Sequence, residues 1–114
     1  MHPQLREALN QELARAAESS GRGAHAEAFI HLERAHVLSQ RHAWAHAGVH
    51  VRMLRWGFSA RRPGEVLGQL PRMLAALLFS RIWVPAGNTG GANVSAFRPM
   101  PVPPDLADLL AHDR

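Results

Sequence analysis

The sequence contains no cysteine and no tyrosine, and its strongly basic residues are all arginine, with no lysine. Without cysteine, neither a disulfide framework nor a thiolate metal site can form. Any metal site must therefore use imidazole, carboxylate, thioether or water ligands. Without cysteine, tyrosine or a nucleophile-elbow motif, the sequence offers few groups for covalent or acid–base catalysis, so a role other than catalysis is favoured.

Long hydrophobic runs are also missing. The most apolar stretch, residues 73–80, is short and lies between Arg72 and Arg81, so it is not expected to span a bilayer. The first thirteen residues lack the apolar segment of a secretory signal. These features predict a soluble cytoplasmic protein without a membrane span.

Size and charge restrict the function further. A chain of 114 residues with 46% apolar content is expected to form one domain, residues 1–114, around a single core. The net charge of +4 is modest and spread along the chain, which does not favour nucleic-acid binding. Arginine is well suited to planar anions such as carboxylate or phosphate.

Apolar residues recur at helical spacing, which predicts an all-α fold, a small helical bundle. The predicted helices span about residues 3–19, 24–39, 43–58, 63–82 and 105–112. Pro71 lies inside the fourth helix and is expected to kink or split it. The core face of this helix is expected to consist of Val66, Leu67, Leu70, Leu74, Leu77 and Leu78.

Residues 84–104 form a long segment that is not expected to be helical. Its first half is rich in glycine and asparagine, which favour turns, and its second half is rich in proline, which favours an extended path. Four apolar residues offer anchors for packing on the helices: Val94, Phe97, Met100 and Val102. We therefore expect this segment to be docked on the helical domain.

Residues 25–53 hold six of the eight histidines. They are predicted to form two antiparallel helices joined by a turn near residues 40–42. Glu33 and His36 are spaced i, i+3 on the first helix, and His46 and His50 are spaced i, i+4 on the second. In this hairpin the four side chains face one another at one level, an arrangement that helical bundles use to bind metals.

Taken singly, a histidine on an apolar stripe is more often a hydrogen-bonded core residue than a ligand. The coincidence of four ligand-type residues favours a transition metal such as zinc, copper, nickel, cobalt or iron over magnesium or calcium. His42 and Met53 are candidates for additional ligands, and Met53 would favour copper(I). Asn88 and Asn93 flank the glycine-rich turn, and either their side-chain amides hydrogen-bond to the metal ligands or the two residues serve only turn geometry.

Two resemblances are visible. Residues 22–60 resemble one copy of a tetratricopeptide repeat, which implies an antiparallel helical hairpin. The segments 32–42, 50–57, 65–70 and 87–103, which read LERAHVLSQRH, HVRMLRWG, EVLGQL and GNTGGANVSAFRPMPVP, resemble a family of small bacterial proteins catalogued as domain of unknown function 3703. This resemblance implies a small helical bacterial protein, some relatives of which are encoded among heavy-metal resistance genes. It carries no activity that could be transferred.

Three functions remain open. The first is a metal-binding protein, such as a metal buffer, carrier or resistance accessory. The second is an interaction module in which an arginine group binds an acidic peptide or a subunit: Arg52, Arg55, Arg61 and Arg62. The third is a small metal-dependent enzyme that uses Glu33 as a general base. The metal site itself could lie within one chain or be completed by the second copy of a homodimer.

Overall fold

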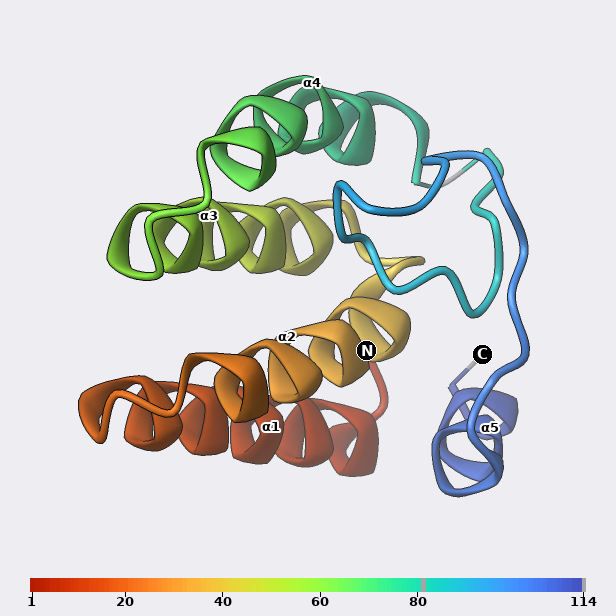
Figure 1. Cartoon of the computed structure of the whole chain (residues 1–114). Helices are drawn as coiled ribbons and strands as arrows, with labels where there is room; N and C mark the ends of the chain where they lie inside the picture. Colours follow the sequence, from red (N-terminus) through yellow and green to blue (C-terminus); the bar gives the residue numbers. More distant parts are fainter. Residues whose placement is uncertain (81, 114) are drawn as a thin grey trace.

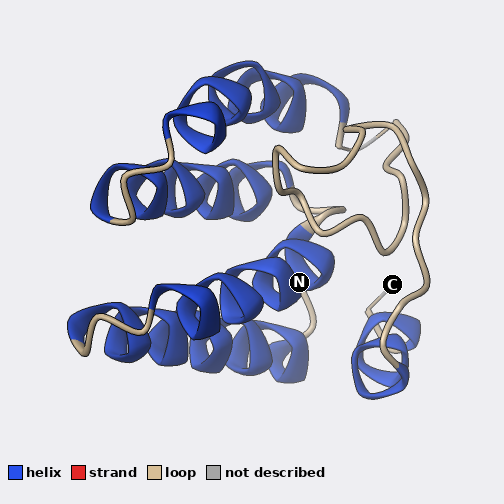
Figure 2. Cartoon of the chain, in the orientation of Figure 1, coloured by secondary structure: helices blue, strands red, loops and turns tan. Residues whose placement is uncertain are grey.

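The computed structural model describes residues 1–80 and 82–113. Within these ranges the chain forms helices and loops and no strand, which confirms the predicted all-α class (Figure 2). The helices are α1 (Pro3–Gly21), α2 (His25–Ser39), α3 (Ala43–Ser59), α4 (Pro63–Phe79) and α5 (Pro104–Ala111). None of the helices in this part of the chain combines the length and the apolar character needed to cross a membrane.

The helices form two antiparallel pairs, α1 with α2 and α3 with α4 (Figure 1). From the turn that joins them, α2 and α3 run in opposite directions, so the end of α2 lies near the start of α3. The long segment after α4 occupies the same side of the molecule as this turn, and α5 returns to pack on α2 and α1. Residues from α2, α3, α4 and the long segment can therefore meet at one place.

The apolar core lies among α1, α2, α3 and α5. It consists of Leu5, Leu9, Ala16, Leu32, Ala35, Val37, Leu38, Val49, Met53 and Leu106. In α1, α2 and α3 these positions recur at helical spacing, so each of these three helices turns one apolar stripe inward. The helices α3 and α4 also pack closely. Val66 of α4 approaches Gly57 of α3 so nearly that a side chain at position 57 would not fit. The apolar core fixes the relative position of α2 and α3, the two helices that flank the turn.

The orientation of α4 differs from the expectation. The leucines predicted to face the core are solvent-exposed, with exposed fractions of 69% for Leu67 and 60% for Leu74. The buried face carries Gln69, Ala76 and Ser80 instead, spaced seven and four residues apart on one side of the helix. Two of these residues hydrogen-bond to histidines of α3, and these bonds require the polar stripe to face inward. The helix also runs through Pro71 as a single element and ends at Phe79, three residues earlier than predicted.

The long segment after α4 is docked, as expected, but mainly through polar contacts. The side chain of Gln40, just after α2, donates to the Pro85 carbonyl oxygen at 3.0 Å and accepts from the Gly87 amide at 3.1 Å. The Glu65 carboxylate accepts from the Ala92 amide at 3.0 Å. Val102 packs on the core, whereas Phe97 is 76% exposed and does not act as the predicted anchor.

Candidate metal centre

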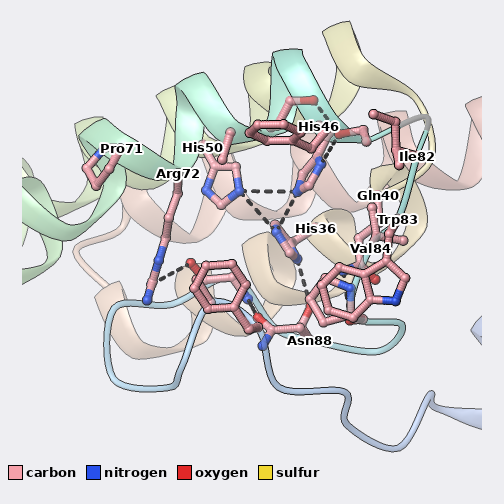
Figure 3. Close-up of a pocket in the computed structure, with 18 of the residues that line it drawn as sticks. His36, Gln40, His46, His50, Pro71, Arg72, Ile82, Trp83, Val84 and Asn88 are labelled. Atoms are coloured by element: carbon pink, nitrogen blue, oxygen red, sulfur yellow. Dashed lines mark hydrogen bonds between the residues drawn. The ribbon is translucent and has the colours of Figure 1, made fainter.

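Three histidines converge beside the turn between α2 and α3. His36 lies near the end of α2, His46 in the first turns of α3, and His50 one turn further along α3. Their Nε2 atoms are 2.8 Å apart for His36 and His46, 3.1 Å for His36 and His50, and 3.2 Å for His46 and His50. All three side chains are buried, and the rings point their Nε2 atoms toward a common point (Figure 3).

The opposite ring nitrogen of each histidine meets a hydrogen-bond acceptor. The Nδ1 of His36 donates to the carbonyl oxygen of Asn88 at 2.7 Å. The Nδ1 of His46 donates at 2.8 Å to the hydroxyl oxygen of Ser80, whose own hydrogen is donated to the Ala76 carbonyl.

The Nδ1 of His50 donates to Gln69 Oε1. The amide nitrogen of Gln69 donates to Glu65 and to the carbonyl oxygen of Gly90, so the oxygen of Gln69 must be the end that faces His50. All three imidazoles therefore carry their hydrogen on Nδ1, and their Nε2 atoms present lone pairs.

Near neutral pH, none of the three imidazoles carries a second proton, on Nε2, that could separate these lone pairs. Burial lowers the pKa of His46 to about 3 and that of His50 to about 4, and it holds the pKa of His36 well below its usual value. Three neutral nitrogens thus face one another at hydrogen-bond distance without a hydrogen between them. A cation bound by all three lone pairs would convert this repulsion into attraction.

Of the four predicted ligands, the structure brings together His36, His46 and His50. Among the described residues, these three form the group whose ligand atoms lie within 4.8 Å of one another, and Glu33 is not in it. All three come from one chain, so the cluster does not require a second copy.

Glu33 interacts instead with the hydroxyl of Thr89, next to the Gly90 that covers His36. Burial raises the pKa of Glu33, and the charge of Glu65 adds to this effect. The hairpin register placed Glu33 opposite His50, but Gln69 of α4 is the residue that pairs with His50.

The other predicted site residues lie outside the group of nitrogens. His42 pairs through Nε2 with Asp113 at 2.6 Å, and Met53 is fully buried in the apolar core. Asn88 contacts His36 through its backbone carbonyl, while its side chain donates to the carbonyl oxygens of Ser95 and Arg98 and so holds the loop. Asn93 is exposed, and it is not among the hydrogen-bond partners of the three histidines.

Sequence reasoning missed Gln69 and Ser80, the partners of His50 and His46. A signal was present, because polar residues at positions 69 and 80 share a helical face with the small Ala76 inside a leucine-rich segment. Gly90 was assigned only a turn role. Its φ of 83° needs glycine, and a Cβ there would lie 2.4 Å from the His36 ring.

Replacing Gly90 by alanine is therefore expected to displace the His36 ring and to strain the loop backbone. We expect metal affinity to fall at least about tenfold, similar to the loss of a residue that orients a ligand. The matched control is Gly48→Ala in α3, where a Cβ meets no atom within 4 Å and should slightly stabilise the helix. Zinc titration of both variants by calorimetry checks the prediction, and equal affinities would contradict it.

The histidines lie at the polar floor of a pocket of about 700 Å³. Figure 3 shows the pocket between α4 and the segment that follows it, with Arg72 on one side of the cluster and Trp83 on the other. Most of its remaining lining is apolar: Pro71, Ala75, Ala76, Phe79, Ile82, Val84, Pro85, Ala96 and Phe97. The size is typical of sites for small molecules.

No curated protein and no solved structure matches the chain. One family model does match, over residues 3–110, which covers nearly the whole sequence and includes the three histidines, Gln69, Ser80 and Gly90. The chain therefore belongs to the family described as protein of unknown function (DUF3703).

Proposed function

We propose that this protein binds a transition metal ion through the Nε2 atoms of His36, His46 and His50. The observation that carries the proposal is the convergence of three Nε2 atoms within 3.2 Å while every Nδ1 hydrogen is donated elsewhere. Hydrogen bonds from Nδ1 to a carbonyl, a hydroxyl and an amide oxygen are the supports that metal-binding histidines commonly have. A core of hydrogen-bonded histidines without a metal would instead place donors against acceptors within the cluster.

The spacing of the nitrogens favours an ion outside their plane. Three imidazole nitrogens about 2.0–2.1 Å from an ion in their own plane would be about 3.5 Å apart. The observed separations of 2.8–3.2 Å are shorter, so the three nitrogens cap one face of the ion. A capped ion keeps at least one coordination position free, which suits zinc, cobalt(II), nickel(II), copper(II) or iron(II) more than three-coordinate copper(I).

Three protein ligands and a free position distinguish this site from a closed structural site. A metal held in this way can exchange an outer ligand without disrupting the fold. We infer a role as a metal buffer or carrier, in which the bound ion remains accessible from the pocket. An enzymatic role would need a proton donor or acceptor beside the ion, and Glu33 does not lie in the cluster.

Zinc binding to the untagged protein tests this function. We expect one zinc ion per chain and almost no proton release at pH 6, because the folded-state pKa values of His46 and His50 are about 3 and 4. Three accessible histidines with ordinary pKa values would release roughly two protons at that pH. Calorimetric titration in buffers of different ionisation enthalpy measures this number. Absence of binding, or release of about two protons, would contradict the proposed site.

A further inference from the structure

Among the described residues, the pocket above the histidines combines an apolar wall with one arginine side chain. Arg72 of α4 lines the pocket and donates to the carbonyl oxygens of Val94 at 2.8 Å and Gly90 at 3.3 Å. Both partners are neutral, and Arg72 forms no ion pair within the described part of the chain. Glu65, whose charge acts on Arg72, is hydrogen-bonded to the Ala92 amide and to Gln69.

A bound divalent ion would add to this positive charge, because its three protein ligands are neutral imidazoles. Buried charges in proteins are compensated by a partner of opposite sign. In the part of the chain that the structure describes, no carboxylate joins the cluster of ligand atoms. Because no carboxylate of the described residues would contact the ion directly, we take the compensating anion to be a separate molecule that enters through the pocket.

The walls of the pocket indicate what else this anion carries. Ala75, Phe79 and Trp83 line the same pocket as the histidines, and so do the exposed side chains of Ile82 and Phe97. A hydrated inorganic anion would leave these surfaces in water, whereas an alkyl or aryl group would bury them.

We propose that the pocket binds a small organic carboxylate with an apolar body, whose carboxylate occupies the free coordination position of the ion held by the three histidines. Arg72 supplies the second positive charge for the carboxylate, and the walls formed by α4 and the segment after it enclose the apolar body. This inference rests on the proposed metal site and identifies its outer ligand.

The test uses the full-length protein loaded with cobalt(II), whose visible absorption reports the ligands and geometry of the ion. Octanoate is the probe, acetate is the control with the same head group, and octanol is the control with the same body. We expect octanoate to shift the spectrum saturably, with an affinity at least tenfold above that of acetate, while octanol produces no shift. Equal affinities for octanoate and acetate, or an unchanged spectrum with octanoate, would overturn the inference.

Two variants locate the ligand. Ala75→Trp places a large side chain at an exposed position of the pocket wall, and Arg72→Gln removes the charge but retains a donor for the loop carbonyls. Each should weaken octanoate binding at least fivefold, whereas Arg55→Gln, at an exposed arginine of α3 outside the pocket, should not. Unchanged octanoate affinity in both pocket variants would also overturn the inference. Failure of cobalt(II) to bind before any carboxylate is added would instead refute the metal site itself.

Discussion

The double variant His46→Asn/His50→Asn is expected to lose stoichiometric metal binding while remaining folded. Asparagine places its amide nitrogen near the position of the histidine Nδ1, so donation to Ser80 and Gln69 can be retained. The Nε2 atoms are removed, which leaves His36 as the single remaining ligand. Structural zinc sites bind with roughly 10–16 kcal/mol from about four ligands, so the loss of two should reduce affinity by on the order of 10⁴-fold.

The control for this variant is His112→Asn. His112 is exposed and lies outside the cluster. Its Nδ1 lies 2.7 Å from the Asp108 carbonyl oxygen, so it bonds through Nδ1 as the cluster histidines do. Elemental analysis and zinc titration should give one ion per chain for the control and none for the double variant. Circular dichroism shows whether both remain helical. One ion per chain in a folded double variant would end the account.

The metal-free protein is expected to unfold in mild acid, between about pH 6 and pH 4. The pKa values of His46 and His50 are lowered in the folded state to about 3 and 4, and that of His36 is also lowered well below its usual value. In the unfolded chain these groups bind protons below about pH 6.5, so the unfolded state binds more protons and the free energy of unfolding falls as pH falls. The free energy of unfolding stops falling only when these histidines are protonated in the folded state as well.

The size of this effect is large for a small protein. Each histidine removes about 1.4 kcal/mol per pH unit while it is protonated only in the unfolded chain, and a domain is typically stable by about 5–15 kcal/mol. Glu33 acts in the opposite direction, because its raised pKa lets the folded state bind a proton first, but it is one group against three. Above about pH 7 the histidines should contribute no pH dependence.

Urea unfolding at several pH values, without metal and with chelator, measures this dependence. The triple variant His36→Asn/His46→Asn/His50→Asn is the control, since its stability should change little between pH 6.5 and pH 4.5. Zinc should raise the unfolding midpoint of the wild-type protein and leave that of the triple variant unchanged. A wild-type stability that is flat across this range would mean that the histidines are not held neutral in the folded state.

The helices and the histidine cluster were predictable from the sequence because both depend on local periodicity. The i, i+4 spacing of His46 and His50 and the short turn after His36 place the three imidazoles together in any antiparallel hairpin at this position. The predicted fourth ligand was not brought into the cluster. The register between two helices assigns a facing partner to Glu33, but it takes no account of α4 or of the loop. The residue beside His50 is Gln69 of α4, and the residue beside His36 is Gly90 of the loop.

The orientation of α4 was the other feature that periodicity could not determine. A helix with a strong leucine stripe ordinarily packs against the protein core through that stripe. Here the face with Gln69 and Ser80 turns inward because both side chains accept hydrogen bonds from the buried imidazoles, whose Nδ1 groups would otherwise be unpaired. The requirements of the site thus determine the orientation of the helix, and they become visible only when the partners of each histidine are known.

Anomalous diffraction from crystals of the zinc-loaded protein, measured on both sides of the zinc absorption edge, locates the metal ion directly. We expect one strong anomalous peak about 2.0–2.1 Å from the Nε2 atoms of His36, His46 and His50, displaced from their plane toward the pocket. A peak bound elsewhere, or no peak in crystals whose three Nε2 atoms still converge, would contradict this expectation.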